Sequence, residues 1–303
     1  MTQVHCFYFS LSKIIEINQN EFINHLVLFH ALGGHQMNIY QFENDNYPLM
    51  DIRGNVFDYE AFQRHTGISI RKKSQKDADH TFNILKSGRS QLVVANCFYL
   101  PYDEVNFQKV NDEHMLVIEN YLPEKDMFIV SDVNHKSVMI KKNELEKARR
   151  EVKYKPYEYF TLKKTNELIE LKTVPQELKA IIKENAISFN KRISEIESKL
   201  ITALKQMNEC TPLFKKIAAK QLYRNFKHPN GLIATRLMMK ESLENIDIYP
   251  KSVSELYGRL ATLWEDFILE SLKFGKGKIQ FEELLLQFDE LMKLEKEANS
   301  YLI

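Results

Sequence analysis

The chain contains 303 residues, of which 44% are hydrophobic and 27% charged, a composition typical of a folded protein with a substantial core. Its 42 basic and 41 acidic residues leave a formal net charge of +1, so the bulk charge gives no indication of nucleic-acid binding. No apolar run reaches the roughly 18 residues of a membrane span, and the N-terminus lacks the basic segment and cleavage site of a signal peptide. Three scattered cysteines exclude a disulfide framework and a zinc ribbon. We therefore expect a cytoplasmic protein with reduced thiols, no membrane association and no nucleic-acid partner.

The first half of the chain alternates helical patterns with apolar, β-rich runs. Apolar residues recur at helical spacing from Phe7 to Ile15 and predict an amphipathic helix that begins at about Cys6. A second helix is expected over residues 21–32, where Gly33 would end it. Strands are predicted over residues 37–42, 68–72, 91–100, 114–122, 127–133 and 137–141, and a short helix over residues 79–87. Helices followed by an antiparallel sheet predict an α+β domain over residues 1–155.

The second half of the chain is rich in Lys and Glu, with apolar residues every three or four positions. This pattern predicts an all-helical domain over residues 160–303. Pro212 is expected as the first residue of one helix. Ser252 and Glu255 have the spacing of a capping box and predict the start of another helix.

Three residues together have the chemistry of a nucleophilic site: Cys6, His114 and Asp132. Cys6 lies at the predicted start of the first helix, where free N–H groups and the helix dipole stabilise a thiolate. His114 begins one predicted central strand, and Asp132 lies near the end of the next. If these strands form a hairpin about Pro123, residues 114 and 132 face each other to within one or two residues of register. A thiol, an imidazole and a carboxylate in this order are the nucleophile, base and orienting group of a catalytic triad.

A structural interpretation of the same residues stays open. A lone cysteine near an N-terminus is usually a small hydrophobic side chain, and a lone histidine on a strand is usually structural. On that hypothesis the chain is a non-catalytic α+β module with a helical domain that binds a partner.

Several short motifs suggest a family. They are His5-Cys6, Leu32-Gly33-Gly34, Asp51-Ile52-Arg53-Gly54, Leu100-Pro101-Tyr102-Asp103, His114 and the stretch Asn230–Leu237. On these motifs the chain resembles the BtrH-type family of papain-like acyltransferases, named after an acyltransferase of butirosin biosynthesis. Within that group it looks most like cysteine-protease-like amide synthetases of the closthioamide type. The resemblance implies a papain-like cysteine-protease fold, with N-terminal helices and an antiparallel sheet, followed by an all-helical C-terminal domain.

The resemblance also implies an activity. An acyl group on the phosphopantetheine of a carrier protein would pass to Cys6 and then to a small amine, which forms an amide in antibiotic biosynthesis of the nonribosomal type. His114 would act as the base, and Asp132 would fix its tautomer. No bound cofactor and no metal are expected; the partners would be the carrier protein and the amine, and homo-oligomerisation is left open. The alternative is a cysteine peptidase or a thioester hydrolase that uses the same triad.

Four further residues are candidates for stabilising the oxyanion or lining the pocket. Papain-like enzymes place a Gln a few residues before the cysteine, and here Gln3 is the only glutamine that precedes Cys6. Asn96, Tyr99 and Tyr102 lie at or after the end of an apolar strand and are candidates for the pocket wall. Packing at the strand end is the alternative for all three.

A basic run is the candidate docking surface for an acidic carrier protein. It comprises Lys141, Lys142, Arg149 and Arg150. The alternative is a solvated helix face, because glutamates are interspersed in the run. Cys97 is expected to be an inert core thiol, and His25, His30 and His35 are expected at the surface or in an interface.

Overall fold

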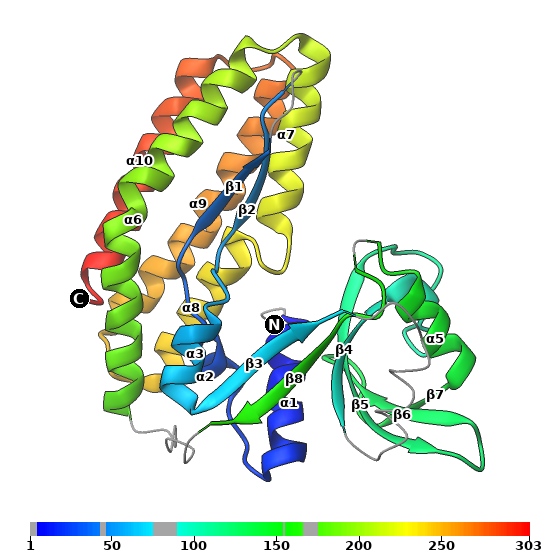
Figure 1. The fold of residues 1–303 in the computed structure, drawn as a ribbon. Helices are drawn as coiled ribbons and strands as arrows, with labels where there is room; N and C mark the ends of the chain where they lie inside the picture. Colours follow the sequence, from blue (N-terminus) through cyan, green and yellow to red (C-terminus); the bar gives the residue numbers. More distant parts are fainter. Residues whose placement is uncertain (1–4, 43–46, 75–89, 154, 166–174) are drawn as a thin grey trace. The chain divides into compact units, whose positions relative to one another are not determined.

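The computed structural model describes residues 5–42, 47–74, 90–153, 155–165 and 175–303. The chain forms two compact units (Figure 1). The sheet unit comprises Val4–Leu28 and Phe62–Lys172, and the helical unit comprises Phe29–Ala61 and Thr173–Ile303. The chain passes from one unit to the other within α2 (His25–Ala31) and within α3 (Tyr59–Thr66).

The sheet unit is built on a six-stranded antiparallel sheet with the order β3-β8-β4-β5-β6-β7. Its strands are β3 (Ile68–Lys73), β4 (Gln91–Asn96), β5 (Glu113–Leu122), β6 (Met127–Ser131), β7 (Val138–Lys141) and β8 (Tyr159–Lys164). Strand β8 comes last in the sequence but enters between β3 and β4, so that Tyr159 pairs with Lys73 on one side and with Val93 on the other. The short 3-10 helix η1 (Cys97–Tyr99) follows β4, and the helix α5 (Lys142–Arg150) follows β7.

The core of the sheet unit explains why β4 is apolar from Leu92 to Ala95. Every residue of β4 is buried, as expected for a central strand covered on both faces. One apolar cluster joins the sheet to α5 and includes Val93, Ala95, Leu116, Ile118, Phe128, Val130, Leu145 and Ala148. Helix α1 (Cys6–Gln19) buries its own apolar side chains and is tied to β5 by a hydrogen bond from Ser10 Oγ to the carbonyl oxygen of Met115, at 3.2 Å.

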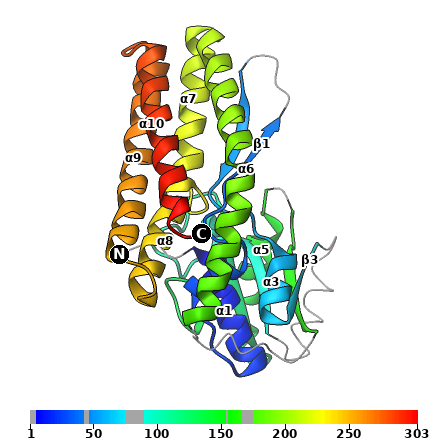
Figure 2. The ribbon, with the colours of Figure 1, turned by 90° about the vertical axis from the view of Figure 1, so that its left-hand side faces the viewer.

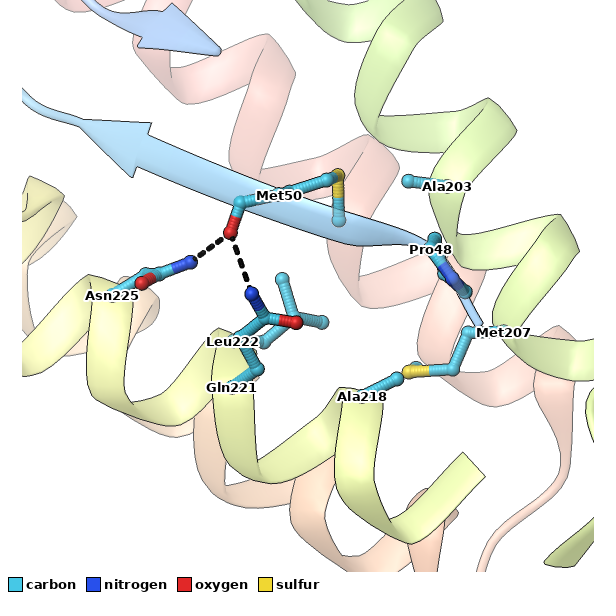
Figure 3. Close-up of a pocket in the computed structure, with 8 residues that line it drawn as sticks. All are labelled: Pro48, Met50, Ala203, Met207, Ala218, Gln221, Leu222 and Asn225. Carbon is cyan, nitrogen blue, oxygen red and sulfur yellow. Dashed lines mark hydrogen bonds between the residues drawn. The ribbon is translucent and has the colours of Figure 1, made fainter. Parts of the chain in front are cut away.

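The helical unit contains five long helices and a pair of antiparallel strands (Figures 1 and 2). The helices are α6 (Pro175–Glu209), α7 (Pro212–Lys227), α8 (Leu232–Ile246), α9 (Lys251–Gly275) and α10 (Phe281–Ser300), and the strands are β1 (Asn38–Phe42) and β2 (Leu49–Arg53). Figure 3 shows how β2 is held against α7. The carbonyl oxygen of Met50 accepts hydrogen bonds from Gln221 Nε2 at 3.1 Å and from Asn225 Nδ2 at 2.5 Å. The Met50 side chain packs with Ala203 and Met207 of α6, so the strand pair belongs to the core of this unit.

A buried polar network crosses the helical unit. Arg236 in α8 and Glu295 in α10 form an ion pair at 2.7 Å, with side chains 0% and 1% exposed. The indole N–H of Trp264 donates to the same carboxylate oxygen at 2.7 Å, and Arg236 Nη1 donates to the carbonyl oxygen of His35 at 2.9 Å. His30 and His35 are themselves fully buried, so the prediction of a surface position is wrong for these two residues.

Much of the predicted element order is confirmed. The class is α+β, α1 begins at Cys6, and Pro212 is the first residue of α7, after the N-cap Thr211. The prediction of all helix over residues 160–303 is wrong at its start, because β8 extends to Lys164 and completes the sheet. The helix predicted over residues 79–87 lies outside the described residues.

Two further differences concern helix ends and unit boundaries. The capping box predicted at Ser252 and Glu255 is wrong: α9 begins at Lys251, because Pro250 already occupies the N-cap position with φ −55°. Phe29–Ala61, which the sequence-based boundary assigned to the first domain, belongs to the helical unit. In the described ranges, no helix combines the length and the apolar character that crossing a membrane requires.

Candidate active site

Cys6 is held at the N-terminus of α1 by its neighbours. His5 is buried and caps the helix, because its Nδ1 accepts a hydrogen bond from the backbone N–H of Phe7 at 3.1 Å. The His5 ring also meets the Tyr8 ring edge-on, with 5.5 Å between ring centroids. These contacts anchor the first turn, so the half-buried thiol of Cys6 lies at the positive end of the helix dipole.

His114 and Asp132 meet across the β5–β6 hairpin. His114 is the second residue of β5, and Asp132 directly follows the end of β6. Val117 pairs with Ser131, so Asp132 is level with Leu116, two residues from His114 and within the one or two residues of register that the prediction allowed. Residues two apart on a strand share a face, and diagonal neighbours across a pair remain within reach. His114 Nε2 accordingly lies 3.1 Å from Asp132 Oδ2.

A β-bulge at Glu119 decides which face of the sheet carries Asp132. The strands pair in one register between the turn and Glu119, and the register shifts by one residue beyond it. Without this extra residue, Asp132 would be level with Val117, whose side chain points to the face opposite that of His114. The bulge therefore brings the carboxylate and the imidazole to the same face.

The carboxylate of Asp132 is fully buried and is held by several donors. Its Oδ1 accepts hydrogen bonds from the backbone N–H groups of Asn134 and His135, both at 2.8 Å, and lies 3.1 Å from His135 Nδ1. Its Oδ2 accepts a hydrogen bond from the Tyr102 hydroxyl at 3.1 Å, beside the contact with His114. The orientation of the carboxylate is thus set by backbone and side-chain groups on both oxygens.

The electrostatics of this cluster favour a charged His114. Burial alone would lower the pKa of His114, but the side chains of Asp132 and Cys6 raise it to about 10. Burial alone would raise the pKa of Asp132, but hydrogen bonding to His114 and its charge, together with the Asn134 N–H and His135, lower it to about 2. At neutral pH the cluster therefore holds an imidazolium next to a carboxylate.

The two ring nitrogens of His114 have different neighbours. Nε2 lies 3.1 Å from Asp132 Oδ2, so the imidazolium and the carboxylate form an ion pair through this nitrogen. Because Nε2 faces the carboxylate, Nδ1 is the nitrogen left for the interaction of His114 with Cys6.

Tyr102, expected in the pocket wall, belongs to the cluster. Burial and the charge of Asp132 raise the pKa of Tyr102 well above its usual value, so the hydroxyl stays protonated and donates to the carboxylate. Its ring meets the His135 ring edge-on, with 5.1 Å between centroids. Tyr102 therefore holds both Asp132 and His135.

The other two candidates for the pocket wall are engaged elsewhere. Asn96 is buried and caps η1, and its Nδ2 donates to Asn111 Oδ1 at 2.7 Å and to the Glu151 carbonyl oxygen at 2.9 Å. Tyr99 packs against the α5 cluster and lies under the ammonium group of Lys147, which is 4.8 Å from the ring centroid. Both side chains have the packing role that was the alternative for them.

Gln3, the predicted oxyanion donor, lies outside the described residues. Cys97 is buried, and its Sγ lies 3.1 Å from the carbonyl oxygen of Val110 and 3.2 Å from that of Asp112. Burial raises the pKa of the Cys97 thiol. The prediction of an inert core thiol at this position is consistent with that environment.

The basic run is not a single surface. Arg149 is only 2% exposed, and its Nη2 donates to the carbonyl oxygen of Glu158 at 3.3 Å, so it is unavailable for docking a partner. Burial lowers its pKa to about 10. Lys141 and Arg150 are exposed, and Lys142 is half-buried at the start of α5. The helical spacing of the apolar residues in α5 turns Arg149 toward the core with Ala148.

Sequence reasoning missed two residues of the cluster, His135 and Glu119. Aspartate side chains often accept hydrogen bonds from the backbone N–H groups two and three residues later, which forms a turn. Asp132 does so with Asn134 and His135, and this turn could have indicated that His135 lies close to Asp132. Nothing in the local sequence marks Glu119 as a bulge, because the flanking residues read as a regular strand.

No protein-family model matches this chain, and no curated protein sequence matches it. In the part of the chain that the structure describes, no three His, Cys, Asp or Glu side chains are grouped so as to hold a metal ion.

Proposed function

We propose that this chain is a thioester-dependent acyltransferase that forms amide bonds through an acyl-Cys6 intermediate. The observation that carries the proposal is the interaction of His114 with both Cys6, at a helix N-terminus, and Asp132, a buried carboxylate. A thiol and a carboxylate that both interact with one imidazole are the functional groups of cysteine-dependent acyl transfer. The resemblance to BtrH-type enzymes, with the papain-like fold that it implies, supports acyl transfer from a carrier protein in antibiotic biosynthesis.

In the first half-reaction, the donor is an acyl thioester on the phosphopantetheine of a carrier protein. The sulfur of Cys6, whose proton has passed to His114, attacks the carbonyl carbon, and the bond between that carbon and the pantetheine sulfur breaks. His114 gives its proton to the departing thiolate, which leaves as a thiol. One thioester replaces another at nearly equal energy, so the site has to supply positioning and charge stabilisation more than driving force.

In the second half-reaction, a small amine attacks the Cys6 thioester. Neutral His114 takes the proton from the attacking nitrogen, and the intermediate collapses with loss of the Cys6 thiolate. The products are the amide and the restored pair of thiolate and imidazolium. Asp132 stabilises the imidazolium and holds the ring in one orientation throughout the cycle.

The oxyanion of each tetrahedral intermediate needs donors close to Cys6. As the first residue of α1, Cys6 has a backbone N–H without an acceptor inside the helix, and we assign it as one donor. The next N–H, that of Phe7, is bonded to His5. One such donor is worth about 10²- to 10³-fold in rate. Gln3 stays a prediction for the second donor.

The same cluster would serve a thioester hydrolase or a cysteine peptidase, in which water replaces the amine. The acyl-enzyme is common to these activities, and only the second half-reaction separates them. A test must therefore detect the acyl-enzyme first and then compare the two acceptors.

The experiment is intact-protein mass spectrometry after mixing the chain with short acyl-pantetheine thioesters, with and without diaminopropane. Cys6→Ala is the variant that removes the nucleophile. Cys210→Ala is the matched control, because Cys210 is also a half-buried thiol but lies outside the cluster. Peptide mapping locates the acyl group.

A mass gain that is lost in Cys6→Ala, kept in Cys210→Ala, and discharged faster by the amine than by water is the expected result. Equal discharge with and without amine would replace the transferase by the hydrolase. Absence of an adduct at Cys6 under all conditions, with iodoacetamide reactivity like that of Cys210, would overturn acyl transfer altogether.

A further inference from the structure

Glu119 connects the strand that carries His114 to the loop that carries Asp132. Its Oε1 accepts a hydrogen bond from Ser131 Oγ at 2.5 Å, and its Oε2 accepts one from Ser137 Oγ at 2.9 Å. Ser131 Oγ in turn accepts the backbone N–H of Ser137 at 2.7 Å. One carboxylate on β5 thus bonds both ends of the loop formed by residues 131–137.

The loop is also closed from within. The backbone N–H of Asp132 donates to the carbonyl oxygen of His135 at 2.8 Å, and the Asp132 carboxylate accepts two backbone N–H groups of the same loop. These bonds shape the loop, and the pairing of Ser131 with Val117 holds its first residue to β5. The bond from Glu119 to Ser137 ties the last residue of the loop to the same strand, which also carries His114.

The backbone at the end of the loop needs such support. Ser137 adopts a φ of +51°, in the left-handed region that a residue with a Cβ occupies at a cost of about 1 kcal/mol. Its N–H and its hydroxyl are both used in the bonds to Ser131 and Glu119. The two bonds therefore stabilise the loop in this conformation.

We propose that Glu119 is a positioning residue for the triad: through Ser131 and Ser137 it keeps the Asp132 carboxylate against His114. The inference rests on the proposed function, since it assigns Glu119 a role in maintaining the His114 imidazolium. Glu119 acts in two ways, as the bulge that sets the face of Asp132 and as the carboxylate that holds its loop.

The consequence of losing the bonds has a definite sign. Asp132 is one of the groups that raise the pKa of His114, so a carboxylate that moves away leaves a less basic imidazole. Glu119→Ala removes both bonds. Glu119→Gln keeps them, because the amide oxygen accepts from Ser131 and the amide N–H donates to the Ser137 hydroxyl. Asn120→Ala is the matched control, since Asn120 is the next residue of β5 and its exposed side chain bonds the N–H of Tyr121.

The test follows His114 directly by NMR titration of protein labelled at the histidine Cε1. Glu119→Ala is expected to lower the titration midpoint of His114 by about one pH unit. Glu119→Gln and Asn120→Ala should behave like the wild type.

Three results would overturn the proposal. The first is a folded Glu119→Ala variant in which His114 titrates at the same pH as in the wild type. The second is a Glu119→Gln variant that behaves like Glu119→Ala, because the charge of Glu119 and not its bonds would then act on His114. If Glu119→Ala does not fold, Ser137→Ala removes one of the two bonds at an exposed site. It should lower the titration midpoint of His114 by a smaller amount. The third contradicting result is an unchanged midpoint in this variant.

Failure of the proposed function is distinguishable from failure of this inference. A wild-type protein that forms no acyl-enzyme on Cys6 contradicts acyl transfer, while the effect of Glu119 on the titration of His114 is still measured. Conversely, an acyl-enzyme in the wild type with no effect of Glu119→Ala on His114 leaves the function standing and removes the role of Glu119.

Discussion

His114 Nε2 lies 3.1 Å from Asp132 Oδ2, although the two residues are two positions out of register on their strands. The contact exists because the extra residue at Glu119 places the Asp132 side chain on the same face of the sheet as His114. It joins a buried carboxylate to an imidazole that also interacts with the Cys6 thiol. The basicity of His114 is therefore the property through which changes at this site should be measured.

Asp132→Asn should separate charge from geometry. The amide oxygen can still accept the N–H groups of Asn134 and His135, but the negative charge next to His114 is lost. We expect the His114 titration midpoint to fall and acylation of Cys6 to slow by about 10²- to 10⁴-fold. The measurement is the pH dependence of acyl-enzyme formation, whose alkaline limb should move to lower pH. An unchanged limb in a folded variant would contradict the role of Asp132.

Iodoacetamide should label Cys6 in preference to the other two thiols at pH 6.5. Burial raises the pKa of Cys97 and also that of Cys210, so both are largely protonated at this pH. Cys6 lies at a helix N-terminus and interacts with the charged His114, so we expect it to be the most reactive of the three thiols. Peptide mapping after short exposure should find most of the label on Cys6, and His114→Ala should abolish the preference. Equal labelling of Cys6 and Cys210 would count against an activated nucleophile.

Mild acid should destabilise the helical unit through His30 and His35. Burial lowers the pKa of each to about 3, from 6.5 in the unfolded chain. The folded pKa values lie below the unfolded one, so this stability is complete above pH 6.5 and is lost as the pH falls toward 3. At pH 5.5 the two residues together should cost about 3 kcal/mol relative to neutral pH.

Urea unfolding at pH 7.5 and pH 5.5 measures this loss, and the fluorescence of Trp264, the one tryptophan of the sequence, reports on the helical unit. His35→Gln, which keeps a partner for Asn299, should be less stable at neutral pH but should show a smaller loss between the two pH values. Equal stability of the wild type at both pH values would contradict the prediction.

Glu295→Gln should be far more damaging than neutralisation of an exposed glutamate. The variant leaves the guanidinium of Arg236 buried without a counter-ion, which typically costs about 3–5 kcal/mol. Glu255→Gln is the matched control, because Glu255 pairs with Lys251 at the surface, where the two side chains are 59% and 83% exposed. Urea unfolding of both variants at pH 7.5, followed by Trp264 fluorescence, compares them. A similar small effect of both would mean that the buried pair adds little to stability.

Local sequence signals predicted the elements that carry the candidate site. The start of α1 at Cys6 follows from apolar residues at helical spacing, and β5 and β6 follow from long apolar runs. These signals come from residues that lie close together in the sequence. They were enough to select Cys6, His114 and Asp132 as one group.

Other features depend on contacts between residues that lie far apart in the sequence. Strand β8 inserts between β3 and β4, which lie far before it in the chain, although residues 160–164 fall at the start of the predicted all-helical domain. Arg149 reads as part of a basic surface but is buried, because the apolar stripe of α5 turns it inward. His30 and His35 read as surface or interface residues, but both are fully buried, and their polar partners come from α8 and α10.

The sequence by itself determined the helix that presents Cys6 and the strands that carry His114 and Asp132, because periodicity and helix caps act within a few residues. Only the tertiary structure decided the face of the sheet on which Asp132 lies, since one bulged residue at Glu119 inverts that face without altering the apolar pattern. It also supplied Tyr102 and His135 as further partners of the carboxylate, because a buried charge is stabilised by whichever donors the fold brings to it.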